Sequence, residues 1–286
     1  MSASVSLSIA TNTAIAAGKG FGWFVTGSPT LFAETIHSLA DVGNQVLLKV
    51  GEVRGSAGPD PLHPFGRGQE KYFWSLVSAV SVFFVGCGIN IYHGVHALLA
   101  PVPAEPFTLL VLGLLVFAFV LEAWTFRVAL KEIGGFAGLR RSRSNVTVLA
   151  VLLEDAVALL GIVLTLVVAG VSMLWEPRPV FDAVIAIAVG VLLGLMALFL
   201  AALNRRFLID TTDPNLDRAA ATWLNAHGIG GDVRSLVLDD RSALVFVHTR
   251  GDVPQSEAVG QALAAHLEAE DDRKIEAVYW QFQAAS

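Results

Sequence analysis

Six long apolar segments place the strongest constraint on how this 286-residue chain can fold. A helix that crosses a membrane needs about 20 mostly apolar residues, and these segments have that character. Turn-forming stretches such as TGSP and WEPRP separate them. The segments cover residues 7–25, 29–53, 70–99, 106–131, 145–174 and 179–203. We therefore expect six transmembrane helices.

The composition agrees with a membrane protein. Hydrophobic residues make up 54% of the chain and charged residues 15%, whereas an average soluble domain has about 25% charged residues. The net charge of -6 argues against nucleic acid as a partner. The single cysteine, Cys87, excludes an intramolecular disulfide. The lipid bilayer is the first partner that the sequence indicates.

Lysine and arginine in short loops indicate which side of the membrane each loop faces. On one side of the six segments, the connections carry Arg54, Arg67, Arg140, Arg141, Arg143, Arg205 and Arg206. On the opposite side, Arg178 is the basic residue of the connections. Both termini are therefore expected on the cytoplasmic side, or on the matrix side in an organelle. We expect a bacterial inner membrane, or an organellar membrane if the protein is eukaryotic.

The chain changes character after Arg206. Residues 213–227 open with an Asp-Pro cap signal and carry apolar side chains at helical spacing. The remaining patterns predict strands at 234–240 and 242–250, a helix at 256–269 and a strand at 274–282. We therefore expect a six-helix transmembrane transport domain over 1–206 and a small cytoplasmic αββαβ domain over 207–286.

The second apolar segment contains an unusual polar stripe, ETIHSLADVGNQ. His37 and Asp41 are four residues apart and therefore share one face of a helix. Glu34, Asn44 and Gln45 extend this stripe. Ionisable groups in hydrocarbon cost about 2.5–3.5 kcal/mol each on insertion scales. A bound ion, a water-filled path or a partner helix would offset that cost.

The fifth segment contains two acids, Glu154 and Asp155, in LLEDAVALLG. At about 1.5 Å per residue, Asp41 lies roughly 18 Å and Asp155 roughly 15 Å from the cytoplasmic ends of their helices. Because the two helices run in opposite directions, these acids are expected to meet near the midplane. An imidazole with two or three carboxylates suits Zn²⁺, with Fe²⁺, Co²⁺ and Mn²⁺ as further options. The alternative is a buried His–Asp hydrogen bond that only holds helices together.

Three stretches, GSPTLFAETIHSLADVGNQVLL, PDPLHPFGRGQEKY and VLLEDAVALLG, resemble the cation diffusion facilitator family and its zinc transporter 9-like branch. The resemblance covers nearly the whole chain. It implies a homodimer that exchanges metal ions for protons and carries a ferredoxin-like, metallochaperone-like C-terminal domain. It also implies a transport site with two ligands from the second helix and two from the fifth. His37, Asp41 and Asp155 match three of these positions.

The fourth ligand position of the family is occupied by Val151, which cannot bind a metal. Glu154 is the nearest substitute, although it points about 100° away from Asp155 on an ideal helix. Glu34 is a second option, and a water molecule is a third.

Two other metal sites of the family are weakened in this sequence. Asp60 and His63 match a metal site in the cytoplasmic loop, but Arg67 stands where a second histidine is usual. In the C-terminal domain, His248 occupies a position where a metal ligand can occur, whereas Trp280 replaces another expected ligand. We expect neither position to be the main metal site.

Four further polar residues are candidates for the ion path or for a proton relay: Asn12, Asn44, Gln45 and Glu122. An acid inside a membrane segment is by default a functional hypothesis. Pairing with Arg127 near the cytoplasmic end is the alternative for Glu122.

These patterns predict a transporter of divalent metal cations and not an enzyme. We expect zinc/proton antiport by alternating access, with efflux from the cytoplasmic or matrix side. Metal binding requires deprotonated ligands, so the same residues can hold either the ion or protons. A transport-inactive scaffold or regulator of the same fold is the alternative that Val151 and Arg67 favour. An intramembrane metallohydrolase is disfavoured because the HExxH signature is absent.

Overall fold

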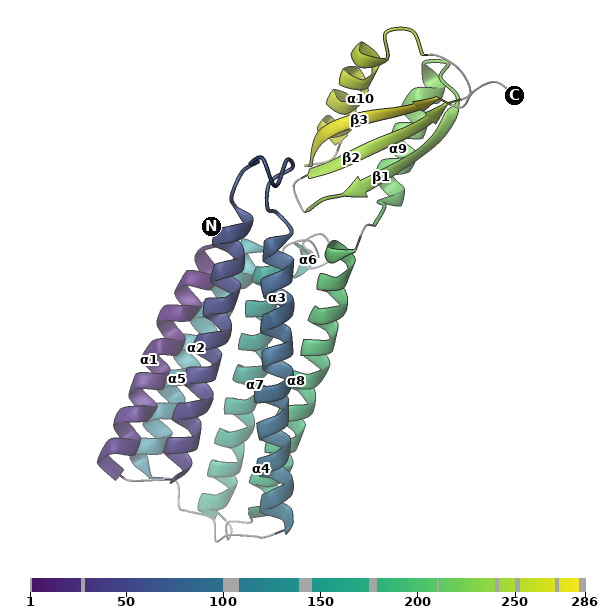
Figure 1. Cartoon of the computed structure of the whole chain (residues 1–286). Helices are drawn as coiled ribbons and strands as arrows, with labels where there is room; N and C mark the ends of the chain where they lie inside the picture. Colours follow the sequence, from purple (N-terminus) through teal and green to yellow (C-terminus); the bar gives the residue numbers. More distant parts are fainter. Residues whose placement is uncertain are drawn as a thin grey trace. The chain divides into compact units, whose positions relative to one another are not determined.

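A computed structural model of the chain consists of two compact units (Figure 1). The helical unit comprises Met1–Arg54 and Glu70–Asn204, and the sheet unit comprises Gly55–Gln69 and Arg205–Ser286. The structure describes residues 2–26, 29–99, 108–138, 146–174, 179–209, 211–239, 242–249, 253–270 and 273–282.

The helical unit is a bundle of long helices. Its elements are α1 (Ala3–Thr26), α2 (Pro29–Gly55), α3 (Glu70–Ser81), η1 (Val82–Cys87), α4 (Gly88–Leu99), α5 (Leu109–Glu132), α6 (Gly135–Gly138), α7 (Val146–Leu174) and α8 (Pro179–Leu208). α3, η1 and α4 follow one another without a break, and η1 is a π-helical stretch. The first residues of α1, α3 and α7 and the last residues of α2, α5 and α8 lie at the same end of the bundle (Figure 1). α2 and α7 therefore run in opposite directions.

Four helical segments among the described residues are long and apolar enough to cross a membrane. They are Glu70–Leu99, Leu109–Glu132, Val146–Val168 and Ala183–Leu208. The long helices α1 and α2 are not among these four, and α2 contains the polar stripe. At this level the structure agrees with a helical membrane domain.

Glycines allow α4 and α8 to approach each other closely. A Cβ atom on Gly94 would lie 2.5 Å from Cγ1 of Ile187 and 2.7 Å from the carbonyl oxygen of Ala183. A Cβ atom on Gly190 would lie 2.9 Å from Cγ1 of Ile91. Small residues at helix contacts are typical of membrane proteins, because close backbone approach increases van der Waals packing there.

The sheet unit contains one three-stranded sheet with the strand order β1-β2-β3. Its elements follow the chain as α9 (Pro214–Ala226), β1 (Gly231–Val237), β2 (Ser242–Thr249), α10 (Ser256–Glu270) and β3 (Lys274–Phe282). β1 pairs antiparallel with β2, and β2 pairs parallel with β3. A parallel pair needs a crossover connection, and α10 lies in that connection. β1 begins earlier than expected because Gly231 already pairs with Thr249.

The core of the sheet unit is apolar. Alternating β2 residues, Ala243, Val245 and Val247, share a cluster with residues of α9 and α10, so both helices cover one face of the sheet. The expected cap is present, since the Asp213 side chain accepts a hydrogen bond of 2.9 Å from the Asn215 amide and Pro214 begins α9.

Candidate metal site in the helical unit

Acidic side chains from three helices interact inside the helical unit. They are Asp41 of α2, Glu122 of α5, and Glu154 and Asp155 of α7. Asp155 is 1% exposed and Glu122 and Glu154 are each 8% exposed, while Asp41 is half-buried. Asp155 thus lies within electrostatic range of Asp41.

Glu122 lies beside Asp155. Its carboxyl group is in hydrogen-bonding contact with the Asp155 carboxyl group, and α5 packs against both α1 and α7. Glu122 also interacts electrostatically with Asp41 and with Lys19 of α1. Carboxylates that approach one another in a low-dielectric interior repel strongly, so this arrangement favours a bound cation or protons.

Glu154 has different partners from its neighbour in sequence. Its Oε1 accepts a hydrogen bond of 2.8 Å from Nδ2 of Asn44, and its Oε2 accepts one from Nε2 of Gln45. Oδ1 of Asn44 in turn accepts a hydrogen bond of 2.5 Å from the Ser78 hydroxyl. Both oxygens of Glu154 are therefore held by amides of α2.

Asp155 retains unused bonding capacity. Its Oδ2 is buried and makes no hydrogen bond to any residue that the structure describes. Val151, one turn earlier on the same helix, is fully buried. An acceptor oxygen without a donor in a buried position costs free energy. A cation that reaches Oδ2 would remove that cost.

The structure does not describe the side chains of two predicted ligands. His37 and Glu34 belong to α2, but their side chains lie outside the described residues. Among the side chains that are described, no three His, Cys, Asp or Glu residues form a group that could hold a metal ion. Of the predicted path residues, Asn12 is buried and its Nδ2 donates a hydrogen bond of 3.3 Å to the Ser8 hydroxyl of the same helix.

In the loop at residues 55–69, the acid is already paired. Oδ1 of Asp60 lies 2.9 Å from Nδ1 of His63, and its Oδ2 lies 2.7 Å from Nη2 of Arg67. The hydrogen bonds from His63 and then from Arg67 lower the pKa of Asp60. The permanently charged Arg67 thus already pairs with the Asp60 carboxylate, which a metal at this loop would need as a ligand.

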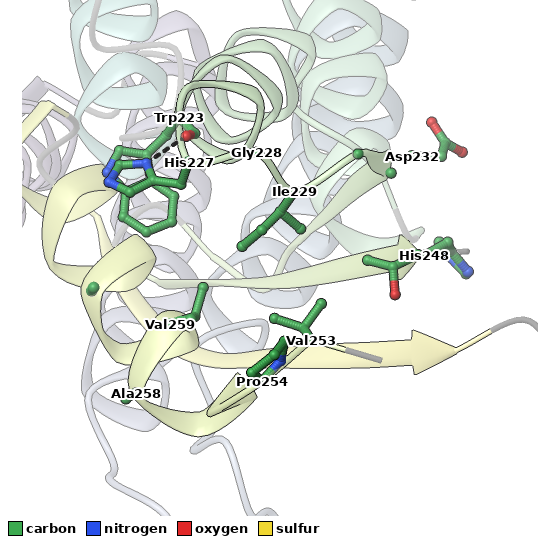
Figure 2. Close-up of a pocket in the computed structure, with 14 residues that line it drawn as sticks. Trp223, His227, Gly228, Ile229, Asp232, His248, Val253, Pro254, Ala258 and Val259 are labelled. Atoms are coloured by element: carbon green, nitrogen blue, oxygen red, sulfur yellow. Dashed lines mark hydrogen bonds between the residues drawn. The ribbon is translucent and has the colours of Figure 1, made fainter. Parts of the chain in front are cut away.

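In the sheet unit, His248 lines a cavity of about 1240 Å³. Figure 2 shows His248 and Asp232, its partner in the β1–β2 register, at one side of this cavity. On the other side the rings of Trp223 and His227 stack with their centroids 3.9 Å apart, and Nδ1 of His227 donates to the Trp223 carbonyl oxygen. One imidazole and one carboxylate are fewer ligands than a structural metal site uses.

Two serines that hydrogen-bond to residues of other helices were not predicted from the sequence. Ser78 of α3 holds Asn44, and Ser75 accepts a hydrogen bond of 3.0 Å from Nδ2 of Asn204 in α8. The two serines are three residues apart and so lie on one face of α3. That spacing, in an apolar segment, is the signal that could have revealed them.

The four arginines at 140, 141, 143 and 178, which the orientation prediction uses, lie outside the described residues.

Comparison with known proteins assigns the family. The model of the cation efflux transmembrane domain matches residues 5–209. A Xenopus laevis protein named proton-coupled zinc antiporter SLC30A9, mitochondrial, is 37% identical over 200 residues, which are 67% of this chain and 35% of that protein. Metal tolerance protein C4 of Arabidopsis thaliana is 33% identical over 197 residues, which are 65% of this chain and 42% of that protein.

A third relative is a shorter match. Magnetosome protein MamM of Paramagnetospirillum magneticum is 34% identical over 92 residues, 32% of this chain and 28% of that protein. The chain spans about a third of the length of the SLC30A9 proteins it matches. The family match covers most of the chain and includes Asp41, Glu122, Glu154 and Asp155. The chain therefore belongs to the cation efflux, or cation diffusion facilitator, family of transporters, in its SLC30A9-like branch.

Proposed function

We propose that this protein moves a divalent metal cation across a membrane in exchange for protons, with Zn²⁺ as the main cargo. The observation that carries the proposal is that Glu122 and Asp155 are buried side by side and interact electrostatically with the half-buried Asp41, while one oxygen of Asp155 lacks a hydrogen-bond donor among the described residues. Buried carboxylates are costly unless they are neutralised. The relatives named as proton-coupled zinc antiporters support zinc as cargo and protons as counter-ion.

We assign His37, Asp41 and Asp155 as cargo ligands. The imidazole of His37 favours zinc, with Fe²⁺, Co²⁺ and Mn²⁺ as weaker competitors. Glu154, Glu34 and a water molecule are the options for the coordination that Val151 leaves open, and the hydrogen bonds of both Glu154 oxygens to α2 favour Glu34 or water. Because the ligands must lose protons to bind metal, metal and protons exclude each other at this site, and this exclusion couples the two fluxes.

We further propose six membrane crossings, which add α1 and α2 to the four apolar spans. The 27 residues of α2 extend over about 40 Å at 1.5 Å per residue, and buried residues of its polar stripe, Asn44 and Gln45, bond to Glu154 and need not meet lipid. Six crossings place both termini on the same side, and the arginines of the connections favour the cytoplasmic or matrix side. The sheet unit, of the ferredoxin-like αββαβ type, would then lie on that side and contribute to a homodimer.

Zinc uptake into proteoliposomes across a pH gradient tests the proposal. We expect zinc entry to drive proton movement in the opposite direction, and Asp41→Ala and Asp155→Ala each to lower uptake about 100-fold. Fe²⁺, Co²⁺ and Mn²⁺ added in competition rank the cargo. Normal uptake by both variants would refute the site, and an absence of zinc binding to the wild-type protein would favour a transport-inactive scaffold.

A further inference from the structure

The position of Glu154 differs from what a cargo ligand requires. Its two oxygens accept hydrogen bonds from Asn44 and Gln45, which are 6% and 0% exposed. The NH₂ group of each amide is therefore removed from water, and Glu154 accepts its hydrogen bond. A metal that recruited Glu154 would have to break these bonds and leave buried amide donors unsatisfied.

Helix geometry separates Glu154 from the cargo ligand beside it. Successive residues point about 100° apart on an α-helix. When Glu154 bonds to α2, Asp155 is turned toward Glu122 of α5, with which it is in contact. Among the described residues, Oδ2 of Asp155 has no donor, whereas each oxygen of Glu154 has one. Asp155 therefore has an oxygen available for a cation, and Glu154 does not.

The hydrogen bonds of Glu154 continue into a third helix. Asn44 donates to Glu154 and accepts from Ser78, so its amide joins α7 to α3 through α2. The acceptor and donor sides of the Asn44 amide are both used, which determines its orientation. Asn44 lies three residues after Asp41, on the same face of α2. The link that holds Glu154 therefore also sets the position of Asp41 relative to Asp155.

We propose that Glu154 is a positioning residue that holds α7 against α2, and through Ser78 against α3, and does not bind the cargo. This inference rests on the proposed transport function. Glu154 sets the separation of Asp41 and Asp155 by bonding Asn44 and Gln45. Both of its carboxyl oxygens are satisfied by amide donors, as is usual for buried polar groups.

The variant Glu154→Gln separates this role from that of a ligand. A glutamine side chain keeps one acceptor for Asn44 and replaces the other by an NH₂ donor. Gln45 can receive that donor, because its Oε1 is buried and has no hydrogen-bond partner among the described residues. A rotation of the Gln45 amide therefore restores the link, whereas a neutral amide is a poor substitute for a carboxylate ligand.

The experiment measures zinc uptake by the full-length protein in proteoliposomes as a function of zinc concentration. Asp155→Asn is the matched control, since it makes the same acid-to-amide change at the next residue. We expect Glu154→Gln to keep the KM within about twofold of wild type and Asp155→Asn to raise it tenfold or more. Glu154→Ala and Asn44→Ala should lower the maximal rate about tenfold with less change in KM. A tenfold rise of KM in Glu154→Gln would overturn the proposal.

A thermal-unfolding cycle of Asn44→Ala, Glu154→Ala and the double variant tests the link without transport. We expect the double variant to unfold no earlier than the less stable single variant, because the two residues share one interaction. Additive decreases in Tm would contradict the proposal. If Asp41→Ala and Asp155→Ala transport zinc normally, the proposed function fails, whereas this cycle still decides the role of Glu154.

Discussion

The two units of this protein differ in the polar side chains that they bury. Among the described residues, all but three of the buried polar and charged side chains belong to the helical unit, and the exceptions are Ser235, Ser242 and Thr249. The core of the sheet unit consists of Leu, Val, Ala and Ile. Conversely, large apolar side chains of the helical unit are exposed, including Phe24, Phe84 and Leu195.

This difference follows from the solvent of each unit. In water, burial of apolar surface stabilises a fold by about 25 cal/mol per Å², so the sheet unit places its leucines and valines inside. In hydrocarbon, apolar contacts with lipid replace apolar contacts within the protein, and helices associate through close packing and polar contacts. The buried polar side chains of the helical unit can therefore contribute to helix association as well as to the proposed cargo site.

The largest effect is expected from placing an acid in the apolar core. Leu263 of α10 is fully buried, and Leu263→Asp should destabilise the sheet unit by about 4 kcal/mol or more. Limited proteolysis of the full-length protein measures this as rapid cleavage within 205–286. The reverse exchange, Gln45→Leu in the helical unit, should cost less, because one hydrogen bond to Glu154 is lost and no charge is buried. Equal losses of stability in both variants would contradict the view that the two units differ in the side chains they need inside.

Close packing in the helical unit can be tested with two alanines. Gly94→Ala should destabilise the unit by about 1–3 kcal/mol, because its new Cβ would lie 2.7 Å from the Ala183 carbonyl oxygen. Gly113→Ala in α5 is the matched control, since a Cβ there meets nothing within 4 Å. Thermal unfolding in detergent should show a lower Tm for the first variant and an unchanged or slightly higher Tm for the second.

The loop acid Asp60 differs from the buried Asp155 in that it pairs with an arginine, Arg67. Replacing this cation in Arg67→His gives Asp60 a second imidazole beside His63. We expect zinc affinity at the loop to rise at least tenfold, measured by calorimetry in a background of Asp155→Ala. Arg67→Ala serves as the control, because it removes the charge without adding a ligand. Equal binding by both variants would show that Arg67 does not exclude metal.

The smallest effect concerns the cap of α9. Burial opposes ionisation of Asp213, but the hydrogen bonds from Arg273 and the Asn215 amide outweigh it and lower its pKa. A lowered pKa in the folded state means that this contribution to stability is present above about pH 4, the unfolded value, and is lost as the pH falls through the folded value. Asp213→Ala should cost about 1 kcal/mol at pH 7.

Unfolding of the sheet unit, followed by tryptophan fluorescence between pH 7 and pH 2, measures this effect. The difference in stability between wild type and Asp213→Ala should shrink as the pH falls below about 4. A difference that stays constant over this range would exclude the charge of Asp213 as its cause.

Much of the local structure was predictable because its signals are local. The Asp-Pro pair at 213 and 214 predicted the start of α9, and the alternating apolar residues of 242–250 predicted β2. The boundaries of β1 were less accurate, because Gly231 enters the sheet through its pairing with Thr249, a contact that no local pattern reveals.

At the candidate site, the sequence alone identified which residues share a helix face and roughly how deep they lie. Periodicity and the 1.5 Å rise therefore sufficed to predict that Asp41 and Asp155 lie at similar depth. The tertiary structure decided which neighbouring helix each face meets. In the folded protein Glu154 accepts hydrogen bonds from side-chain amides of α2, and Glu122 of α5 lies beside Asp155. The physical reason is that helical spacing orders side chains around one axis, whereas hydrogen-bond partners depend on how several axes pack.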